Sequence, residues 1–231
     1  MQRPSQRTAS WEIYSGLRAR APLVVRADGR GFKKVLEGAR KPYDLGFARS
    51  MAGCTSRLFQ DSGLSPVLAY TFSDEISLLF LDPPFAGRVE KIDSLIAGFL
   101  SAALSMELKR LVSMDCRTIP LCRSEILEYL AERQDEAWRN HVFSYGFYML
   151  VEEGLTATEA MEQIRGMREP EIHEMVFHRG VNLARTDPWE RRGIMVYRRE
   201  GEIVQDWELP LLRSDEGRML LEAITGTRDE G

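Results

Sequence analysis

The sequence predicts an α+β fold built on a mostly antiparallel sheet. A short apolar, β-branched run at residues 22–25 reads as a buried strand. Two further apolar runs at about 67–81 are interrupted only by Ser73, Asp74 and Glu75, which is typical of a tight hairpin. Apolar residues keep helical spacing from Arg88 to Leu111, and 113–121 read as another strand. The order strand, helix, hairpin, helix, strand favours an antiparallel sheet with helices packed on it.

Two helices are expected on either side of the first strand. Ser10 can cap a short helix through about Arg20, with its apolar residues on one face: Trp11, Tyr14 and Leu17. Asp44 can cap a second helix that keeps its apolar spacing until Ser62-Gly63. Between the first strand and this helix we expect a basic loop containing Arg30, Lys33, Lys34, Arg40 and Lys41.

The second half of the chain is mainly helical in pattern. Ser124 can cap a helical region that extends to Glu153, as one long helix or two abutting ones. Shorter helices are expected further on, starting at Thr156, at Pro170 and after Ser214. A small hairpin is expected at 194–197 and 202–207, around Glu200-Gly201.

Length and composition limit the possible functions. The 231 residues allow one large domain or two small ones, and 44% hydrophobic residues can bury an ordinary core. A net charge of −4 argues against a bulk polyelectrolyte binder, although local basic clusters can still hold phosphates. The three cysteines have no metal-ligand or disulfide spacing, and no 18-residue apolar run or signal peptide is present. We expect a soluble protein of the reducing cytoplasm.

Two acidic motifs are the candidate site. Asp28 follows the first strand, with Gly29 and Gly31 as the expected turn, and Asp74 and Glu75 lie at the hairpin tip. Carboxylates at such positions suit Mg²⁺, which takes oxygen ligands and leaves positions for water and phosphate. Each motif alone is more typical of a solvated turn, but together with the nearby cations they favour a two-metal phosphoryl-transfer site. Glu75 either supports the metal ligands or is merely the first residue of the returning strand.

Several other charged and aromatic residues have two open interpretations. Lys33 and Lys34 either contact a triphosphate or belong to a solvated loop, and Arg117 either binds RNA phosphate or pairs with Asp115. Cations are not favoured at a helix N-terminus, so the cations there, Arg88 and Lys91, are solvated or present for an anion. The remaining candidates are interpreted as core or surface residues without ligand spacing: Trp138, His141, His173 and His178.

The motifs together resemble those of the histidine-tRNA guanylyltransferase superfamily, the 3′–5′ nucleotide polymerases. The similarity runs in collinear order over about residues 10–200. Its elements are VRADGRGF, Lys41-Pro42, FSDEISLLF, Arg88 with Lys91, MDCR at 114–117, YLAERQDEAWRN, EEGLTATEAMEQIRG, GVN and DPWERRG.

The resemblance implies a palm similar to that of polymerases and nucleotide cyclases, followed by a helical C-terminal region with a small hairpin. Residues 1–122 would form the catalytic core, and 123–231 would complete the same compact unit. Two Mg²⁺ ions would be held by Asp28, Asp74 and the Gly29 carbonyl. The implied catalytic residues are Asp28, Asp74, Glu75 and Lys41, the last assisting activation of a 5′-monophosphate by ATP. The incoming nucleotide's 3′-hydroxyl would then attack the activated 5′ end of the RNA.

The resemblance also implies substrates and the residues that bind them. Nucleoside triphosphates, ATP and GTP among them, would contact Arg26, Gly29, Arg30, Gly31, Phe32, Lys33, Ser73, Arg88 and Lys91. The tRNA would contact Arg117, Arg133, Asn140 and Asn182. By the same resemblance we expect a homo-oligomer, a dimer or a dimer of dimers.

One stretch departs from the eukaryotic members. After Arg133-Gln134 those enzymes carry His-Ile-Asn-Asn-Leu-Tyr-Asn-Thr, whereas this chain has Trp-Arg-Asn-His-Val-Phe-Ser-Tyr at 138–145. The departure resembles the guanylyltransferase-like branch of prokaryotic, template-dependent enzymes that repair tRNA 5′ ends. Two alternatives remain. A nucleotide cyclase would carry a GG(D/E)EF-type signature, which is absent, and a non-catalytic tRNA-binding protein would not need both Asp28 and Asp74.

Overall fold

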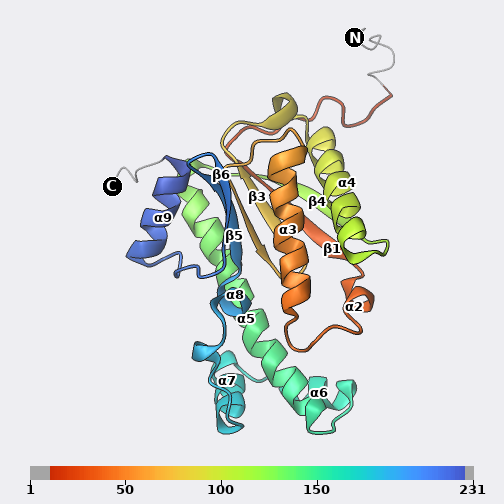
Figure 1. Cartoon of the computed structure of the whole chain (residues 1–231), viewed down its shortest axis with the longest axis vertical. Coiled ribbons are helices and arrows are strands. Elements are labelled where there is room, and N and C mark those ends of the chain that lie inside the picture. The colour runs from red at the N-terminus through yellow and green to blue at the C-terminus, as the bar shows by residue number, and fades with distance from the viewer. Residues whose placement is uncertain (1–10, 227–231) are drawn as a thin grey trace.

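A six-stranded antiparallel sheet forms the centre of the molecule (Figure 1). The structure is a computed structural model that describes residues 11–226. The strand order is β4-β1-β3-β2-β5-β6, and every neighbouring pair is antiparallel. The strands are β1 (Leu23–Arg30), β2 (Leu68–Phe72), β3 (Glu75–Phe80), β4 (Ser113–Pro120), β5 (Ile194–Arg199) and β6 (Glu202–Asp206). The predicted α+β class and antiparallel sheet are confirmed.

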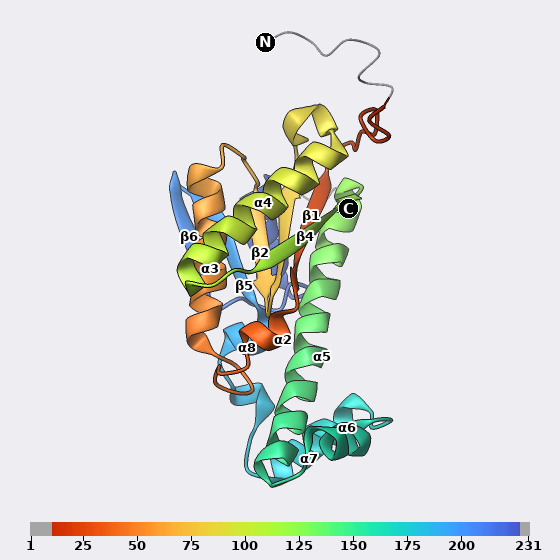
Figure 2. The same ribbon diagram turned by 90° about the vertical axis from the view of Figure 1, so that its right-hand side faces the viewer.

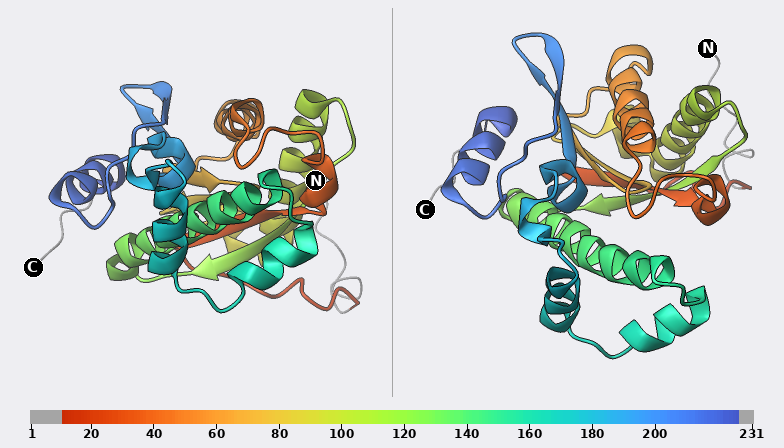
Figure 3. Two further views of the ribbon diagram at one scale, coloured as in Figure 1. Left: turned by 90° about the horizontal axis from the view of Figure 1, so that it is seen from below. Right: turned by 60° about the horizontal axis from the view of Figure 1, so that its bottom comes forward.

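Helices cover both faces of this sheet (Figure 3). On one face lie α3 (Leu45–Asp61) and α4 (Val89–Leu108), packed on alternate sheet residues such as Val25 and Leu78. On the other face, α5 (Ile126–Glu152) and α9 (Asp215–Thr225) pack on Val24 and Leu79. Successive strand residues point to opposite faces, so β1 contributes to both cores.

The helix α5 continues past the end of the sheet (Figure 2). Its C-terminal half packs with α6 (Ala157–Ile164) and α7 (Glu169–His178) around a third apolar cluster that includes Val142, Leu150 and Val176. A short helix, α8 (Pro188–Arg192), then leads back to β5. The sheet therefore takes four strands from before residue 122 and two from after it, while the division at 122 itself stays a prediction.

Most predicted element boundaries agree with the structure. The Asp44 carboxylate accepts a hydrogen bond from the Phe47 backbone N–H at 2.8 Å and caps α3. Thr156 and Ser214 cap α6 and α9 in the same way. The long helical region is one helix, α5. Among residues 11–226, no helix is long and apolar enough to cross a membrane.

Three local predictions are wrong. Residues 11–20 form turns rather than a helix, because their apolar side chains are exposed and have no surface to pack on: Trp11, Tyr14 and Leu17. The predicted cap, Ser10, lies outside the described residues. The basic loop contains a one-turn helix, α2 (Phe32–Val35), held by the buried Phe32 ring. Ser124 is not the capping residue. At the turn that leads into α5, the Glu125 carboxylate instead accepts a hydrogen bond from the Cys122 backbone N–H at 2.6 Å.

Candidate functional site

Three carboxylates lie in a row across neighbouring strands. Asp28 of β1 pairs with Glu75 of β3 on one side and with Asp115 of β4 on the other. Directly paired residues of antiparallel strands place their side chains on the same face, here the face that α5 covers. The sequence indicated Asp28 and Glu75 as site residues, but Asp115 only as part of a motif and as a possible partner of Arg117, because strand register is not visible in the sequence. The strand β1 also runs on to Arg30, so Asp28 and Gly29 lie within it and the turn begins at Gly31.

Asp74 lies against the backbone of Gly29. It occupies the turn between β2 and β3, next to Ser73, whose φ is +51° and whose Oγ donates to Asp74 Oδ1 at 3.1 Å. A Cβ on Gly29 would stand 2.7 Å from Asp74 Oδ2 and 2.4 Å from the Phe32 ring. Only glycine leaves room for this approach. The structure thus brings together Gly29 and Asp74, with Asp28 beside them.

The two aspartates influence each other electrostatically. Burial raises the pKa of the Asp74 carboxyl above its ordinary value, and the neighbouring negative charge of Asp28 adds to the rise. A cation between them would relieve this repulsion. In the part of the chain that the structure describes, no group of three or more His, Cys, Asp or Glu side chains is arranged around a metal position. A metal here would use two carboxylates and a backbone carbonyl, as suits a cation that retains water and phosphate ligands.

Glu75 is held between two arginines. It is the first residue of β3, and its Oε1 lies 3.0 Å from Nε of Arg133 on α5. Its Oε2 lies 3.9 Å from Nε of Arg26 on β1. All three side chains are less than a quarter exposed, and neither buried Nε points its N–H at a hydrogen-bond acceptor. Burial raises the pKa of Glu75 although both guanidinium groups oppose the rise. The structure therefore buries Arg133, a predicted RNA contact, against the site.

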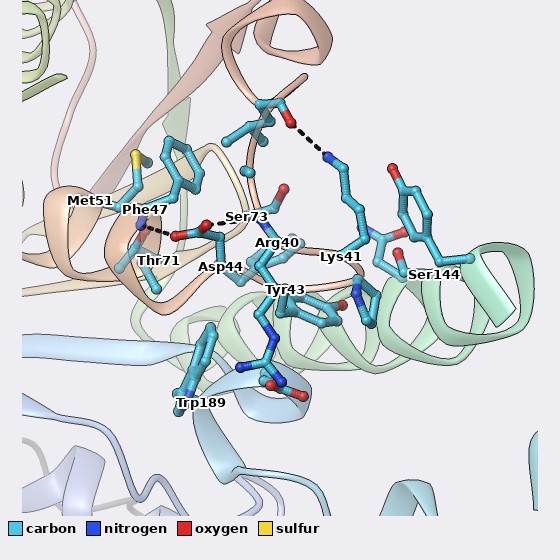
Figure 4. A pocket seen from close by; sticks show the side chains of 18 of the residues that line it. Arg40, Lys41, Tyr43, Asp44, Phe47, Met51, Thr71, Ser73, Ser144 and Trp189 are labelled. Atoms are coloured by element: carbon cyan, nitrogen blue, oxygen red, sulfur yellow. Dashed lines mark hydrogen bonds between the residues drawn. The ribbon is translucent and has the colours of Figure 1, made fainter. Parts of the chain in front are cut away.

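A cavity of about 250 Å³ opens beside the hairpin tip (Figure 4). Its walls are the loop before α3, the end of β2 with Ser73, and the C-terminal half of α5. Polar and aromatic side chains point into it, among them Arg40, Lys41, Tyr43, Ser144 and Trp189. Lys41 Nζ donates to the Leu36 carbonyl at 2.8 Å and lies 5.4 Å from the centre of the Tyr148 ring. Lys41, which is predicted to assist activation of the RNA 5′-monophosphate, is therefore anchored in the cavity wall.

The stretch of α5 that departs from the eukaryotic motif forms part of this wall. Asn140, Ser144 and Tyr148 follow each other at intervals of four residues and share one helix face. Sequence reasoning identified only Asn140, although the spacing was the available signal. The neighbouring His141 is fully buried, its Nε2 lies 3.0 Å from Thr186 Oγ1, and it stacks on Trp138. Of the two interpretations of this histidine, core or surface, the core interpretation is correct.

The remaining predicted residues are spread over the fold. Arg30 ends β1, Gly31 has φ +72°, and Lys33 is exposed on α2. Arg117 pairs with Asp115 at 3.0 Å, which is the salt-bridge alternative. The Asn182 side chain accepts a hydrogen bond from the Ala184 N–H at 3.1 Å and so caps a turn.

Two predicted triphosphate contacts lie away from the carboxylates. Arg88 and Lys91 are at the start of α4, which follows the end of β3 that pairs with Leu23. The adjacent Gly87 carbonyl accepts from the Ala19 N–H at 2.8 Å, so this segment lies where β1 begins and not where Asp28 lies. Lys91 Nζ lies 4.7 Å from the centre of the Phe85 ring. Within one chain, these two cations are not brought together with Asp28 and Asp74.

The comparison with family models is decisive for the family. Residues 5–130 match the model described as tRNAHis guanylyltransferase, and residues 124–222 match the Thg1 C-terminal domain. The chain belongs to the tRNAHis guanylyltransferase family. Its resemblance to this superfamily is therefore confirmed.

Curated relatives carry the same description. The chain is 29% identical to the tRNA(His) guanylyltransferase of Debaryomyces hansenii over 207 residues, which cover 78% of this chain and 76% of the relative. It is 26% identical to tRNA(His) guanylyltransferase 1 of Arabidopsis thaliana over 195 residues, which cover 78% of this chain and 34% of the relative. The chain thus spans about a third of the length of the plant relatives. Enzymes with this name are nucleotidyltransferases.

Solved structures share the fold. A bacterial tRNA(His) guanylyltransferase (Thg1)-like protein in complex with ATP superposes with a TM-score of 0.80 and 25% identity, covering 94% of this chain and 97% of that one. The tRNA(His) guanylyltransferase of Saccharomyces cerevisiae gives a TM-score of 0.70 at 23% identity, over 85% of this chain and 93% of that one. At that identity the second match supports the fold alone.

Proposed function

We propose that this protein is a 3′–5′ nucleotidyltransferase that adds nucleotides to the 5′ end of tRNA. Membership of the tRNAHis guanylyltransferase family supports the reaction class. The observation that carries the proposal is the packing of Asp74 against Gly29, beside Asp28 and next to an open cavity. Such an arrangement would supply acidic oxygen ligands next to the pocket that Ser73, the neighbour of Asp74, lines, as phosphoryl transfer between a nucleotide and a second substrate requires.

The cavity is the proposed nucleotide site. The related bacterial protein was solved in complex with ATP, and a second structure of this kind holds GTP. Tyr43 and Trp189 supply aromatic surface for a base, and Ser144 supplies a hydroxyl. Arg40, Lys41 and Ser73 also line the cavity and would contact the phosphates of the nucleotide. We leave Arg88 and Lys91 out of this assignment because they lie at the other end of β1.

The carboxylate pair fits Mg²⁺, for which two ions are proposed. Asp28, Asp74 and the Gly29 carbonyl would hold them, since an Asp74 oxygen lies close to the Gly29 backbone and the two carboxylates repel each other without a cation. When bound, Mg²⁺ lowers the pKa of the attacking hydroxyl and stabilises charge at phosphorus.

The chain's own residues position the reactants. Lys41 helps convert an RNA 5′-monophosphate into an adenylate, with pyrophosphate released from ATP. The 3′-hydroxyl of the incoming nucleotide then attacks the 5′-phosphorus of the adenylated RNA. An O3′–P bond forms, the bond from this phosphorus to the adenylate breaks, and AMP leaves. Arg26, buried on the sheet face two residues before Asp28, supplies positive charge toward the phosphates, and Glu75 with Arg133 fixes its position. Positioning of this kind accounts for most of the catalysis in phosphoryl transfer.

Addition is proposed to follow the template strand, as in the guanylyltransferase-like branch. The support is the stretch 138–145, which differs from the eukaryotic motif and forms part of the cavity wall. Pairing with the opposite nucleotide then selects the base, and the protein only has to accept correct pair geometry. Repair of shortened 5′ ends is the corresponding role.

The test uses a 5′-truncated tRNA, Mg²⁺ and each of the four nucleoside triphosphates in turn. Four substrates differ only in the nucleotide opposite the missing position. The expected product carries the complementary base in every case. Addition of G whatever stands opposite would contradict templating but not the nucleotidyltransferase. Cyclic nucleotide made without RNA would favour a cyclase, and RNA binding without addition would favour a non-catalytic protein.

A further inference from the structure

A group of basic side chains lies at the end of the sheet that carries the aspartates. We name it the basic rim: Arg30, Lys33, Lys34, Lys109 and Arg110. All five are exposed, and none of the described residues supplies a carboxylate within 4 Å of them. On a protein with a net charge of −4, these five residues form a local group of positive charge.

Contacts show that the rim is one surface although it comes from two distant stretches of the sequence, 30–34 and 109–110. The Arg110 guanidinium donates to the Val35 carbonyl at 3.2 Å, which joins the end of α4 to α2. Arg30 pairs with Ser113 at the start of β4. Lys109, with φ +52°, is the residue at which α4 ends. Figure 1 shows α2 directly below this end of α4 and next to the end of β1.

The rim is distinct from the cavity, although the two surfaces adjoin just after α2, where Leu36 and Ala39 line the cavity. None of the five rim residues lines the cavity, and the rim borders β4, the edge strand of the sheet next to β1. A nucleotide in the cavity would leave Lys34, Lys109 and Arg110 free for another ligand. Glu107, the acidic residue nearest to Lys109 in the sequence, lies 3.9 Å from Arg57 and is partly neutralised.

We propose that the basic rim binds the phosphate backbone of the RNA substrate and guides its 5′ end to Asp28 and Asp74 across the β4 edge. This inference rests on the proposed function. A row of exposed cations suits a polyanion, because each phosphate it neutralises releases a condensed counterion. The contact carries no sequence information, as a template-directed reaction allows.

The experiment compares two variants that each lose two positive charges. K34Q/K109Q removes charge from the rim at residues outside the proposed nucleotide set. R123Q/R199Q removes charge at exposed residues beyond the other end of the sheet, where neither arginine has an ion pair among the described residues. Binding of 5′-truncated tRNA is measured over a range of salt concentrations, and ATP binding is measured in parallel.

We expect K34Q/K109Q to weaken tRNA binding about tenfold at low salt and to flatten the slope of log K against log[salt] by about 1.5 to 2. ATP binding should not change, and R123Q/R199Q should bind tRNA as the wild type does. Equal tRNA binding by both variants, or loss of ATP binding in K34Q/K109Q, would overturn the role of the rim. A wild-type protein that does not bind tRNA at all would instead refute the proposed function and the rim with it.

Discussion

Nε of Arg133, on the helix α5, lies 3.0 Å from Oε1 of Glu75, the residue that follows Asp74 in the hairpin. This contact ties the helix to the sheet next to the candidate metal ligands. It also changes the expected role of both residues. Glu75 offers its carboxylate to two arginines, and Arg133 has its charge turned inward rather than toward solvent. Both are better described as residues that position the site.

Loss of the Glu75 carboxylate should destabilise the fold. In Glu75→Ala, Arg26 and Arg133 would remain largely buried without their main counter-charge, which for a fully buried pair costs about 3–5 kcal/mol and here should cost about 2 kcal/mol or more. Urea unfolding of the purified variant measures the change. The control is Glu136→Ala, which removes an exposed pair with Arg139 and should cost less than about 1 kcal/mol. Equal losses in the two variants would contradict a structural role for the buried pair.

The aspartates should be needed for chemistry and not for folding. Asp28→Asn and Asp74→Asn keep the side-chain shape but remove a charged metal ligand, so nucleotide addition should fall by about 10²-fold or more. Single-turnover addition to truncated tRNA measures the loss, and circular dichroism checks the fold. Either variant retaining a tenth of the wild-type rate would rule out the proposed metal site.

Lys41 should matter for one class of RNA end. Lys41→Ala should impair addition to 5′-monophosphorylated tRNA far more than to 5′-triphosphorylated tRNA, because the triphosphate already carries its leaving group. The two substrates, assayed with the same variant, control for any damage to the cavity wall when the bond to the Leu36 carbonyl is lost. Equal losses would show that Lys41 serves general phosphate binding.

The buried His141 should make stability depend on pH. Burial, aided by the positive charge of Arg191, lowers the pKa of its imidazole from 6.5 to about 4. Between these values the unfolded chain binds a proton that the folded protein does not, so stability decreases as the pH falls through this window. Across the whole window, this proton uptake lowers the free energy of unfolding by about 3 kcal/mol.

Urea unfolding at a series of pH values from 7 to 4.5 measures this dependence. His141→Gln should lower stability at pH 7 and reduce its further loss toward acid. The matched control is His178→Gln, an exposed histidine on α7, which should keep the wild-type pH dependence. An unchanged pH dependence in His141→Gln would show that another group is responsible.

The sequence predicted the parts of the fold that depend on local signals. Asp44 and Thr156 predict the starts of two helices, and the interruption at Ser73-Asp74 predicts the hairpin. The helix predicted for 11–20 failed because its apolar residues found no partner surface, and short helices depend on such packing.

The arrangement of the site depends on long-range pairing, which local patterns do not contain. Asp115 is paired with Asp28 through the register of β4, and Trp189 lines the cavity from α8, far along the chain. Conversely, Arg88 and Lys91 have suitable chemistry but lie where β1 begins. Residue type and order indicated the chemistry; only the register of the strands showed which side chains share a face.

The order in which the sheet closes has a consequence for synthesis on the ribosome. Strand β2 has β5 as its outer neighbour, and Tyr70 Oη donates to the Arg192 carbonyl although the two residues are 122 positions apart. At typical elongation rates, on the order of ten seconds separate the emergence of the hairpin that carries Asp74 from that of β5. During that time β2 is a free strand edge, open to pairing with other chains. A nascent chain stalled before β5 would therefore carry both aspartates and still be prone to aggregate.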